Sequence, residues 1–152
     1  MPETLDPSFR RAVVALNGGR SDARIVQIAC ELARANRAEL VAVHVVEVDW
    51  SLPLDADIAG HSDEAQQVLD FAEQIAEAAR ATMEPVLLQA REAGPALVDE
   101  AAERNADLLI LGLPYRMRFG GEFAIGKTIP YVLKNAPCAV WVIREPIPEV
   151  AS

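Results

Sequence analysis

Short apolar runs alternate with segments of helical periodicity along this chain, and the alternation constrains the fold more than any other feature. The apolar runs are rich in β-branched residues, which is typical of strands buried on both faces of a parallel sheet. The segments between them place apolar residues three and four positions apart, as amphipathic helices do. The expected strands are 11–16, 39–47, 85–90, 107–112 and 139–143, and the expected helices are 21–36, 63–83, 94–105 and 128–135. This order predicts an α/β fold, a single doubly wound, Rossmann-like sheet of five parallel strands with four helices.

Length and cysteine content predict one ordinary domain. With 152 residues the chain can bury a core without disulfides or metals, and no linker or repeat divides it, so we expect one domain over 1–152 with a core over about 9–145. Cys30 and Cys138 form no metal-binding or disulfide pattern and are expected to be buried, reduced thiols. No apolar run reaches membrane-spanning length and the N-terminus lacks signal-peptide features, so we expect a cytoplasmic protein without direct membrane insertion.

The charge of the chain disfavours nucleic-acid binding but is unevenly distributed. The formal net charge is −9, which repels phosphate backbones. Residues 108–144, in contrast, carry five Lys or Arg and one Asp or Glu. Three of these cations, Arg116, Arg118 and Lys127, lie between the fourth strand and the last helix. They suit contacts to phosphate, although a solvated basic loop would have the same composition.

Glycines at the ends of two expected strands suggest where a ligand binds. The first strand ends in Leu16-Asn17-Gly18-Gly19 and the fourth in Gly112. In doubly wound sheets, ligands bind beyond the carboxyl ends of strands, where the strand order reverses. If the two strands are neighbours there, backbone N–H groups and helix N-termini would face one crevice and bind a phosphate-bearing ligand. Ordinary turn chemistry is the alternative explanation of Gly18 and Gly19.

A second sequence motif suggests nucleotide hydrolysis, but the position of this motif relative to the predicted strands argues against it. Residues 121–128 match a glycine, four residues and then Gly126-Lys127-Thr128, as in a P-loop. A P-loop joins a strand directly to its helix, whereas about eight residues separate the fourth strand from Gly121. We therefore consider a slow NTPase that uses Lys127 and Thr128 the least favoured hypothesis. The histidines and the acidic residues of the long 48–62 connection form no metal or catalytic pattern, and we expect that connection to be a functional or mobile loop.

Four motifs resemble those of the universal stress protein family over about residues 9–145. They are Ala15-Leu16-Asn17-Gly18-Gly19, Ala93-Gly94-Pro95, the segment from Gly112 to Thr128, and Ala136-Pro137-Cys138-Ala139-Val140, of which the last is the most specific. The resemblance implies the strand order 3-2-1-4-5 and a homodimer paired through the last strand. It also implies an adenine nucleotide at the carboxyl ends of the first and fourth strands, with the backbone of the second strand against the base.

The residue pattern and the resemblance together define a candidate nucleotide site. Its members are Leu16, Asn17, Gly18, Gly19, Val41 or a near neighbour, Gly112, Arg116, Arg118, Gly126, Lys127 and Thr128. This chain departs from the family pattern in four places: Asn17 replaces an aspartate, Tyr115 replaces a loop glycine, the loop is one residue longer, and Lys127 precedes Thr128. The ligand therefore stays open among ATP, AMP and a cyclic dinucleotide such as cyclic di-AMP, with or without Mg²⁺.

Two functions compete at this stage. The strings 47–55, 114–120 and 130–135 resemble a subtype of the family found behind amino-acid or cation transporters. This implies a regulatory or stress-response domain that binds a nucleotide without turnover and acts on a partner, such as a transporter on a separate chain. The alternative is a homodimeric interaction module with a degenerate, empty pocket that regulates such a partner.

Overall fold

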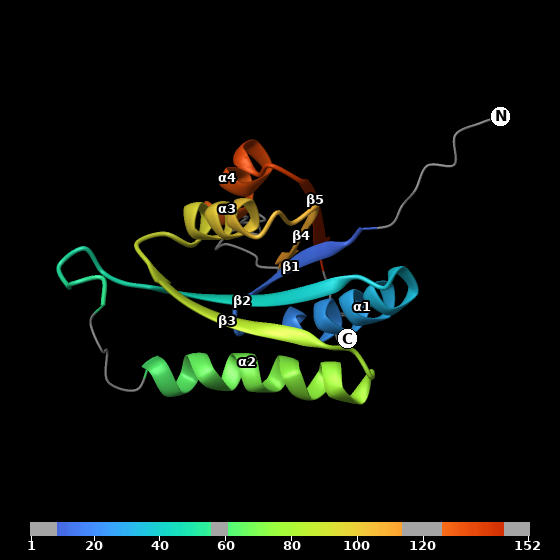
Figure 1. Cartoon of the computed structure of the whole chain (residues 1–152). Coiled ribbons are helices and arrows are strands. Elements are labelled where there is room, and N and C mark those ends of the chain that lie inside the picture. Colours follow the sequence, from blue (N-terminus) through green and yellow to red (C-terminus); the bar gives the residue numbers. More distant parts are fainter. Residues whose placement is uncertain (1–8, 56–60, 114–125, 145–152) are drawn as a thin grey trace, which may run out of the picture.

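The computed structural model describes residues 9–55, 61–113 and 126–144. Strands and helices alternate throughout this part of the chain (Figure 1). The strands are β1 (Arg11–Leu16), β2 (Glu39–Glu47), β3 (Met83–Ala90), β4 (Leu108–Leu113) and β5 (Ala139–Arg144), and the helices are α1 (Ser21–Asn36), α2 (His61–Ala78), α3 (Ala93–Glu103) and α4 (Thr128–Asn135). All neighbouring strands are parallel, in the order β3-β2-β1-β4-β5. The predicted doubly wound sheet is confirmed.

The sheet is covered on both faces, and successive residues of its central strands enter opposite apolar layers (Figure 1). The layer beneath α1 and α2 includes Ala12, Val14, Leu40, Ala42, Leu108 and Ile110. The layer beneath α3 and α4 includes Val13, Val41, Val43, Leu109 and Leu111. Burial on both faces explains why the central strands read as almost continuous apolar runs.

Three helices end in the same backbone motif. In each, a residue other than glycine adopts a positive φ, and the next residue is an alanine that donates its N–H to a carbonyl five positions earlier, as in a Schellman motif. The residues with positive φ are Arg37 (53°), Arg80 (58°) and Asn105 (53°). The hydrogen bonds run from Ala38 to Ala33, from Ala81 to Ala76 and from Ala106 to Ala101, each at 2.9 Å. The pattern turns the chain back into the sheet after each of these helices.

The second helix and third strand differ in extent from the sequence prediction. The prediction carried the helix to Met83, whereas α2 ends at Ala78 and β3 begins at Met83. The helix cannot continue because Arg80 adopts the left-handed conformation. Pro85 lies inside β3 rather than at its start, a position that an edge strand tolerates because its outer N–H groups need no partner in the sheet.

Two further differences affect single residues. β4 continues to Leu113, so Gly112 pairs with Ile143 inside the sheet instead of beginning a turn. Cys138 is half-buried rather than buried, whereas Cys30 is buried as expected. Desolvation raises the pKa of both thiols above the ordinary value, and at Cys138 the negative charge of Asp107 raises the pKa further. Both effects favour the protonated thiol.

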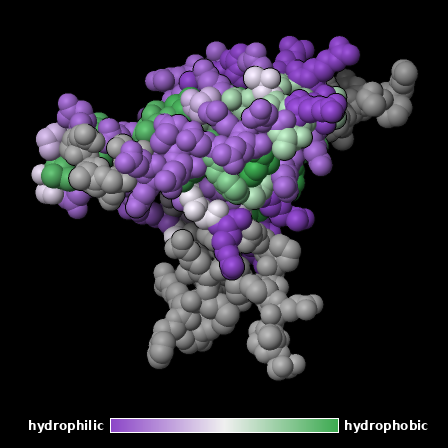
Figure 2. Space-filling view, turned by 90° about the horizontal axis from the view of Figure 1, so that it is seen from below, coloured by the Kyte–Doolittle hydropathy of each residue, from purple (hydrophilic) through white to green (hydrophobic). Residues whose placement is uncertain are grey.

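Part of the long connection after β2 is held against the body of the protein. The guanidinium of Arg91 donates to the carbonyls of Asp49 (2.6 Å) and Leu52 (2.7 Å), and it lies 5.1 Å from the ring centroid of Trp50. Figure 2 shows the molecule from the side of α2. The described surface in this view is mainly hydrophilic, with hydrophobic residues near its centre and at the projecting end on the left. Among the described residues, no helix has the length and apolar character needed to cross a membrane.

Candidate functional site at the carboxyl edge of the sheet

The two strands that end near the predicted site are neighbours. Ala15 of β1 lies level with Leu111 of β4, and on the other side Leu16 lies level with His44 of β2. After β1 the chain enters α1 on one face of the sheet, whereas α4, which follows β4, covers the opposite face. The carboxyl ends of β1 and β4 are therefore the point of strand-order reversal, where doubly wound folds bind ligands.

A cleft of about 950 Å³ opens beside the turn between β1 and α1. Its walls come from this turn, from the end of β2 and from the first half of α2. The polar lining includes Asn17, Asp22, His44, Glu47, Glu64, Gln67 and Asp70, and the apolar lining includes Val46, Val68 and Phe71. The volume lies within the range of small-molecule sites. Its described lining contains carboxylates and amides but no lysine or arginine, so it is acidic.

The turn at the mouth of the cleft is closed by the chain's own side chains. The buried carboxylate of Asp22 accepts the N–H groups of Asn17 (3.1 Å) and Gly18 (2.8 Å). The side-chain oxygen of Asn17 accepts the N–H of Gly19 (2.7 Å), and Gly18 takes a φ of 79° that suits glycine. In this structure the backbone N–H groups that we expected to face phosphate are occupied by Asp22 and Asn17, so their role toward a ligand stays a prediction.

Hydrogen bonding also determines what Asn17 and His44 can offer a ligand. Since the Asn17 oxygen is engaged in the turn, its exposed amide NH₂ is the group left for a ligand. The Nδ1 of His44 lies 2.8 Å from the carbonyl of Leu16 and must donate its proton there, because a carbonyl only accepts. This leaves Nε2 of His44 as the ring nitrogen that can meet a ligand in the cleft lining.

Burial dominates the ionisation of Asp22. Desolvation raises the pKa of this carboxyl above 3.8, although the N–H groups of Asn17 and Gly18 and the nearby His44 act in the opposite direction. An ionised Asp22 places negative charge directly behind the turn. The β1–α1 side of the site is therefore suited to an uncharged, hydrogen-bonding part of a ligand rather than to its anionic part.

Phe71 provides an exposed aromatic surface in this cleft. Its side chain is 50% exposed, although Leu69 and Ala72 beside it in α2 are buried. Val68 and Val46 contribute to the same wall. A flat aromatic ring over aliphatic neighbours is a surface on which a heterocyclic base can stack.

The other side of the carboxyl edge contains the predicted cation Lys127. Its ammonium lies 3.8 Å from a carboxylate oxygen of Glu92, and both side chains are largely exposed. Glu47, at the end of β2, accepts the N–H of Ala93 (3.3 Å) and so occupies the start of α3. The start of α4 has no side-chain cap, and Gly126 just before it adopts a φ of 79° in open space. The first turn of α4 contains no acidic residue, whereas the first turns of α1 and α2 do and the start of α3 is occupied by Glu47.

The structure gathers some predicted residues and separates others. Asn17, Gly18 and Gly19 line the cleft, whereas Lys127 and Thr128 line a small cavity of about 90 Å³ beside α3. Leu16 is buried, but its carbonyl anchors His44 at the cleft. Arg116 and Arg118 lie outside the described residues.

Two residues of the predicted nucleotide site lie outside the cleft. Val41 does not reach the cleft: it lies near the amino end of β2, pairs with Val13 and Glu84, and lines a different cavity. Gly112 packs against α1, where an added Cβ would lie 2.3 Å from Ile25 Cδ1 and 2.8 Å from Ser21 Oγ. Its lack of a side chain is required by packing.

Sequence reasoning missed three residues of the site. Asp22 resembles an ordinary acidic residue in the first turn of a helix, and only the folded turn brings it to Asn17 and Gly18. His44 was missed because it lies within an apolar strand, and the sequence does not show that it is close enough to the carboxyl end to line the cleft. Phe71 did carry a signal, because it interrupts the polar face of an amphipathic helix. In the described part of the chain, no cluster of three His, Cys, Asp or Glu side chains could hold a metal ion.

Comparison with known proteins supports the resemblance to the universal stress protein family. The profile of the universal stress protein family matches residues 8–144. A sensor protein KdpD of Mycobacterium tuberculosis is 30% identical over 142 residues, which are 93% of this chain but only 15% of that protein. A universal stress protein of Methanocaldococcus jannaschii is 24% identical over 144 residues, covering 91% of this chain and 84% of the relative.

Solved structures share the fold. The universal stress protein of Archaeoglobus fulgidus in complex with dAMP has a TM-score of 0.69 at 24% identity, covering 88% of this chain and 97% of the other. A universal stress protein in complex with cAMP has a TM-score of 0.65 at 24% identity and covers 90% and 98% of the two chains. A family protein of Arabidopsis thaliana with AMP bound has a TM-score of 0.63 at 17% identity and covers 90% and 92%. The chain belongs to the universal stress protein family.

Proposed function

We propose that this protein binds an adenine nucleotide at the carboxyl edge of the sheet and acts as a regulatory or stress-response domain without turnover of its own. The observation that carries the proposal is the cleft of about 950 Å³ at the strand-order reversal, which has hydrogen-bonding groups and an exposed aromatic ring in one lining. Structurally similar family members in complex with dAMP, cAMP and AMP support an adenine ligand.

The chemistry of the two sides of this edge suggests how a nucleotide would lie. The base would stack on Phe71, and the sugar or base edge would meet the amide of Asn17 and the Nε2 of His44. The acidic lining repels phosphate, so the phosphates would extend toward the uncapped start of α4. There, Lys127 and Thr128 offer a cation and a hydroxyl, and the predicted Arg116 and Arg118 would contribute from the segment before it.

Binding of the base is tested with substitutions in α2. A ligand held by the native state raises the melting temperature by an amount set by its concentration and Kd. We expect ATP, AMP, cyclic AMP or cyclic di-AMP to give a saturable shift in a thermal-shift titration, with and without Mg²⁺. Phe71→Ala should weaken binding by about tenfold or more through lost stacking. Glu73→Ala, an exposed residue of the same helix outside the cleft lining, is the matched control and should bind as the wild type does.

The observation that the turn is closed favours a second candidate. Asp22 and Asn17 already satisfy the N–H groups of the 17–19 turn, as expected if the pocket is degenerate. The protein would then be a homodimeric interaction module with an empty site. Absence of a shift with all four nucleotides, in a protein that unfolds cooperatively, would contradict nucleotide binding and support this module.

A partner is part of either proposal. The similarity to the sensor protein KdpD covers 15% of that protein, so a domain of this kind can be one part of a larger sensor. We infer that this protein transmits its ligand state to another protein, with a transporter as one candidate. Pull-down with and without the nucleotide identified above tests whether the ligand changes the set of partners.

A further inference from the structure

The amino edge of the sheet, opposite the nucleotide cleft, contains a second cavity of about 660 Å³. Five arginines line it: Arg11, Arg34, Arg37, Arg80 and Arg104. Two glutamates, Glu39 and Glu84, are the carboxylates in the described lining. The lining therefore has an excess of three positive charges in a protein whose formal net charge is −9.

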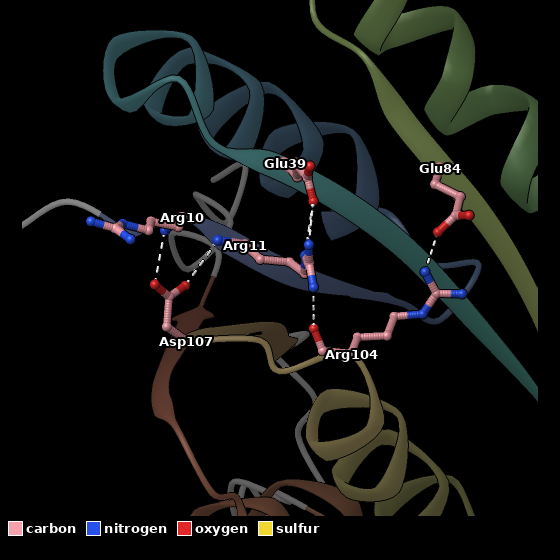
Figure 3. A network of polar contacts seen from close by, with 6 residues as sticks. All are labelled: Arg10, Arg11, Glu39, Glu84, Arg104 and Asp107. Carbon is pink, nitrogen blue, oxygen red and sulfur yellow. Dashed lines mark hydrogen bonds and ion pairs between the residues drawn. The ribbon is translucent and has the colours of Figure 1, made fainter.

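Two of the arginines are fixed by an ion-pair network (Figure 3). Arg11 pairs with Glu39 at 2.8 Å and donates to the carbonyl of Arg104 at 2.5 Å. Arg104 pairs with Glu84 of β3 and with Glu100 one helical turn earlier. This network neutralises both lining glutamates and holds two guanidinium groups rigid.

The remaining arginines are available to a ligand. Arg34 donates once, to the carbonyl of Ala79 (3.2 Å), which leaves most of its N–H groups without a protein partner among the described residues. Neither Arg37 nor Arg80 makes a side-chain ion pair within 9–55, 61–113 and 126–144, and both are exposed. Their positions are defined nonetheless, because each occupies the left-handed residue of a Schellman motif at the edge of the cavity.

The choice of arginine at these two positions supports a role for the side chains. Glycine adopts a left-handed φ without strain, whereas a residue with a Cβ in this conformation destabilises the fold. The chain accepts this cost at Arg37 and at Arg80, in two separate helix ends that meet at one cavity. Strained conformations of this kind are enriched at functional sites, and although Asn105 shows the same motif outside the cavity, Arg37 and Arg80 bring two exposed guanidinium groups to it.

We propose that this cavity is a binding site for a phosphoryl anion such as a diphosphate, separate from the nucleotide cleft. A phosphate carries about 1.5 to 2 negative charges at pH 7, so two joined groups come close to balancing the three excess positive charges. Planar guanidinium groups from several directions match phosphoryl oxygens bidentately. The formal net charge of −9 disfavours binding of the same anion to most of the remaining surface.

Inorganic pyrophosphate is the probe, titrated by calorimetry at low and high salt. All proteins carry Lys127→Gln, which weakens any phosphate binding at α4. The α4 site is then identical in the parent, cavity and control proteins, so a difference between them reports on the amino-edge cavity whether or not the nucleotide proposal holds. We expect saturable binding in this background, weakened by salt. Arg37→Gln with Arg80→Gln should weaken it by tenfold or more, since charge-assisted hydrogen bonds from guanidinium to phosphate are among the stronger ones in proteins. Arg24→Gln with Lys134→Gln removes two exposed positive charges outside the cavity and should change it less than twofold.

A second variant excludes unfolding as the cause. Arg37→Gly with Arg80→Gly removes the same side chains but relieves the left-handed backbone, so this protein should be at least as stable as the parent. It should lose pyrophosphate binding to the same extent as the glutamine pair. Binding that is absent from the Lys127→Gln parent, or equal in the cavity and control variants, would overturn the proposal.

Discussion

Asp22 shows how one buried carboxylate defines a turn. It accepts two backbone N–H groups, from Asn17 and Gly18. Asp22→Asn keeps one oxygen and presents an NH₂ to the second N–H, so we expect the free energy of unfolding at neutral pH to fall by about 1 to 3 kcal/mol. Urea denaturation of the two proteins measures the difference.

The pH dependence of that difference has a definite sign. Burial raises the pKa of Asp22 above 3.8, so just above this pH the folded protein retains a proton that the unfolded chain has lost. Stability from this group is therefore present at acid pH and decreases as the pH rises through the raised pKa. We expect the free energy of unfolding of the wild type, relative to that of Asp22→Asn, to decrease as the pH rises from about 3.8 through the raised pKa. An advantage that grows with pH would show that hydrogen bonding outweighs burial.

Gly112 is required by close packing rather than by a turn. A Cβ at this position would lie 2.3 Å from Cδ1 of the fully buried Ile25. Gly112→Ala should destabilise the protein by about 1 to 3 kcal/mol, as overpacking does. Ile25→Val removes the clashing methyl group, so a double-mutant cycle should show that the two changes together cost less than their sum. Additive effects, measured by chemical denaturation, would place the strain elsewhere.

At the scale of elements, the helix ends provide a test of backbone strain. Arg80 holds a φ of 58° after α2. Arg80→Gly should raise the free energy of unfolding by about 0.5 to 1 kcal/mol, because glycine adopts this conformation without a Cβ clash. Arg34→Gly is the matched control inside α1 and should lower it by about 1 kcal/mol. A thermal melt that places Arg80→Gly below the wild type would contradict the assignment of strain.

The same residue explains why one element was mispredicted. The order of strands and helices followed from periodicity because both faces of the sheet are buried. The end of α2 did not, because Arg80 resembles a solvent-facing helical residue and carries none of the signal that glycine would give. The turn at Asn17-Gly18-Gly19 was visible in the sequence, but its closure by Asp22 depends on packing between elements. Strand order came from the resemblance, since alternation alone leaves several doubly wound orders open.

For the whole molecule, the charges divide between the two edges of the sheet. The carboxyl edge holds an acidic cleft with an aromatic wall, and the amino edge holds an arginine-lined cavity. Sequence charge counts could not show this, because Arg37 and Arg80 lie in the acidic part of the chain and become neighbours only through the parallel βα connections. A net charge of −9 therefore excludes extended polyanions without excluding a small one.

The predicted homodimer through β5 also belongs to this scale. In the described structure β5 lies at one edge of the sheet, and Trp141 at its centre is 36% exposed. Val140 and Val142 pack against the α3–α4 layer, so a charge there would damage the core as well as an interface. In a two-fold dimer paired along this edge, the central residues of the two copies approach each other.

Trp141→Lys should therefore give a monomer, because two ammonium groups would meet near the two-fold axis. Trp141→Ala is the control: it loses the edge-to-face contact with Phe9, at 6.0 Å between ring centroids, but introduces no charge. We expect the wild type and Trp141→Ala to sediment as dimers at equilibrium and Trp141→Lys as a monomer with unchanged far-UV circular dichroism. A dimer that persists in Trp141→Lys would move the interface away from β5, since no edge pairing brings like charges together at its centre without a loss of affinity.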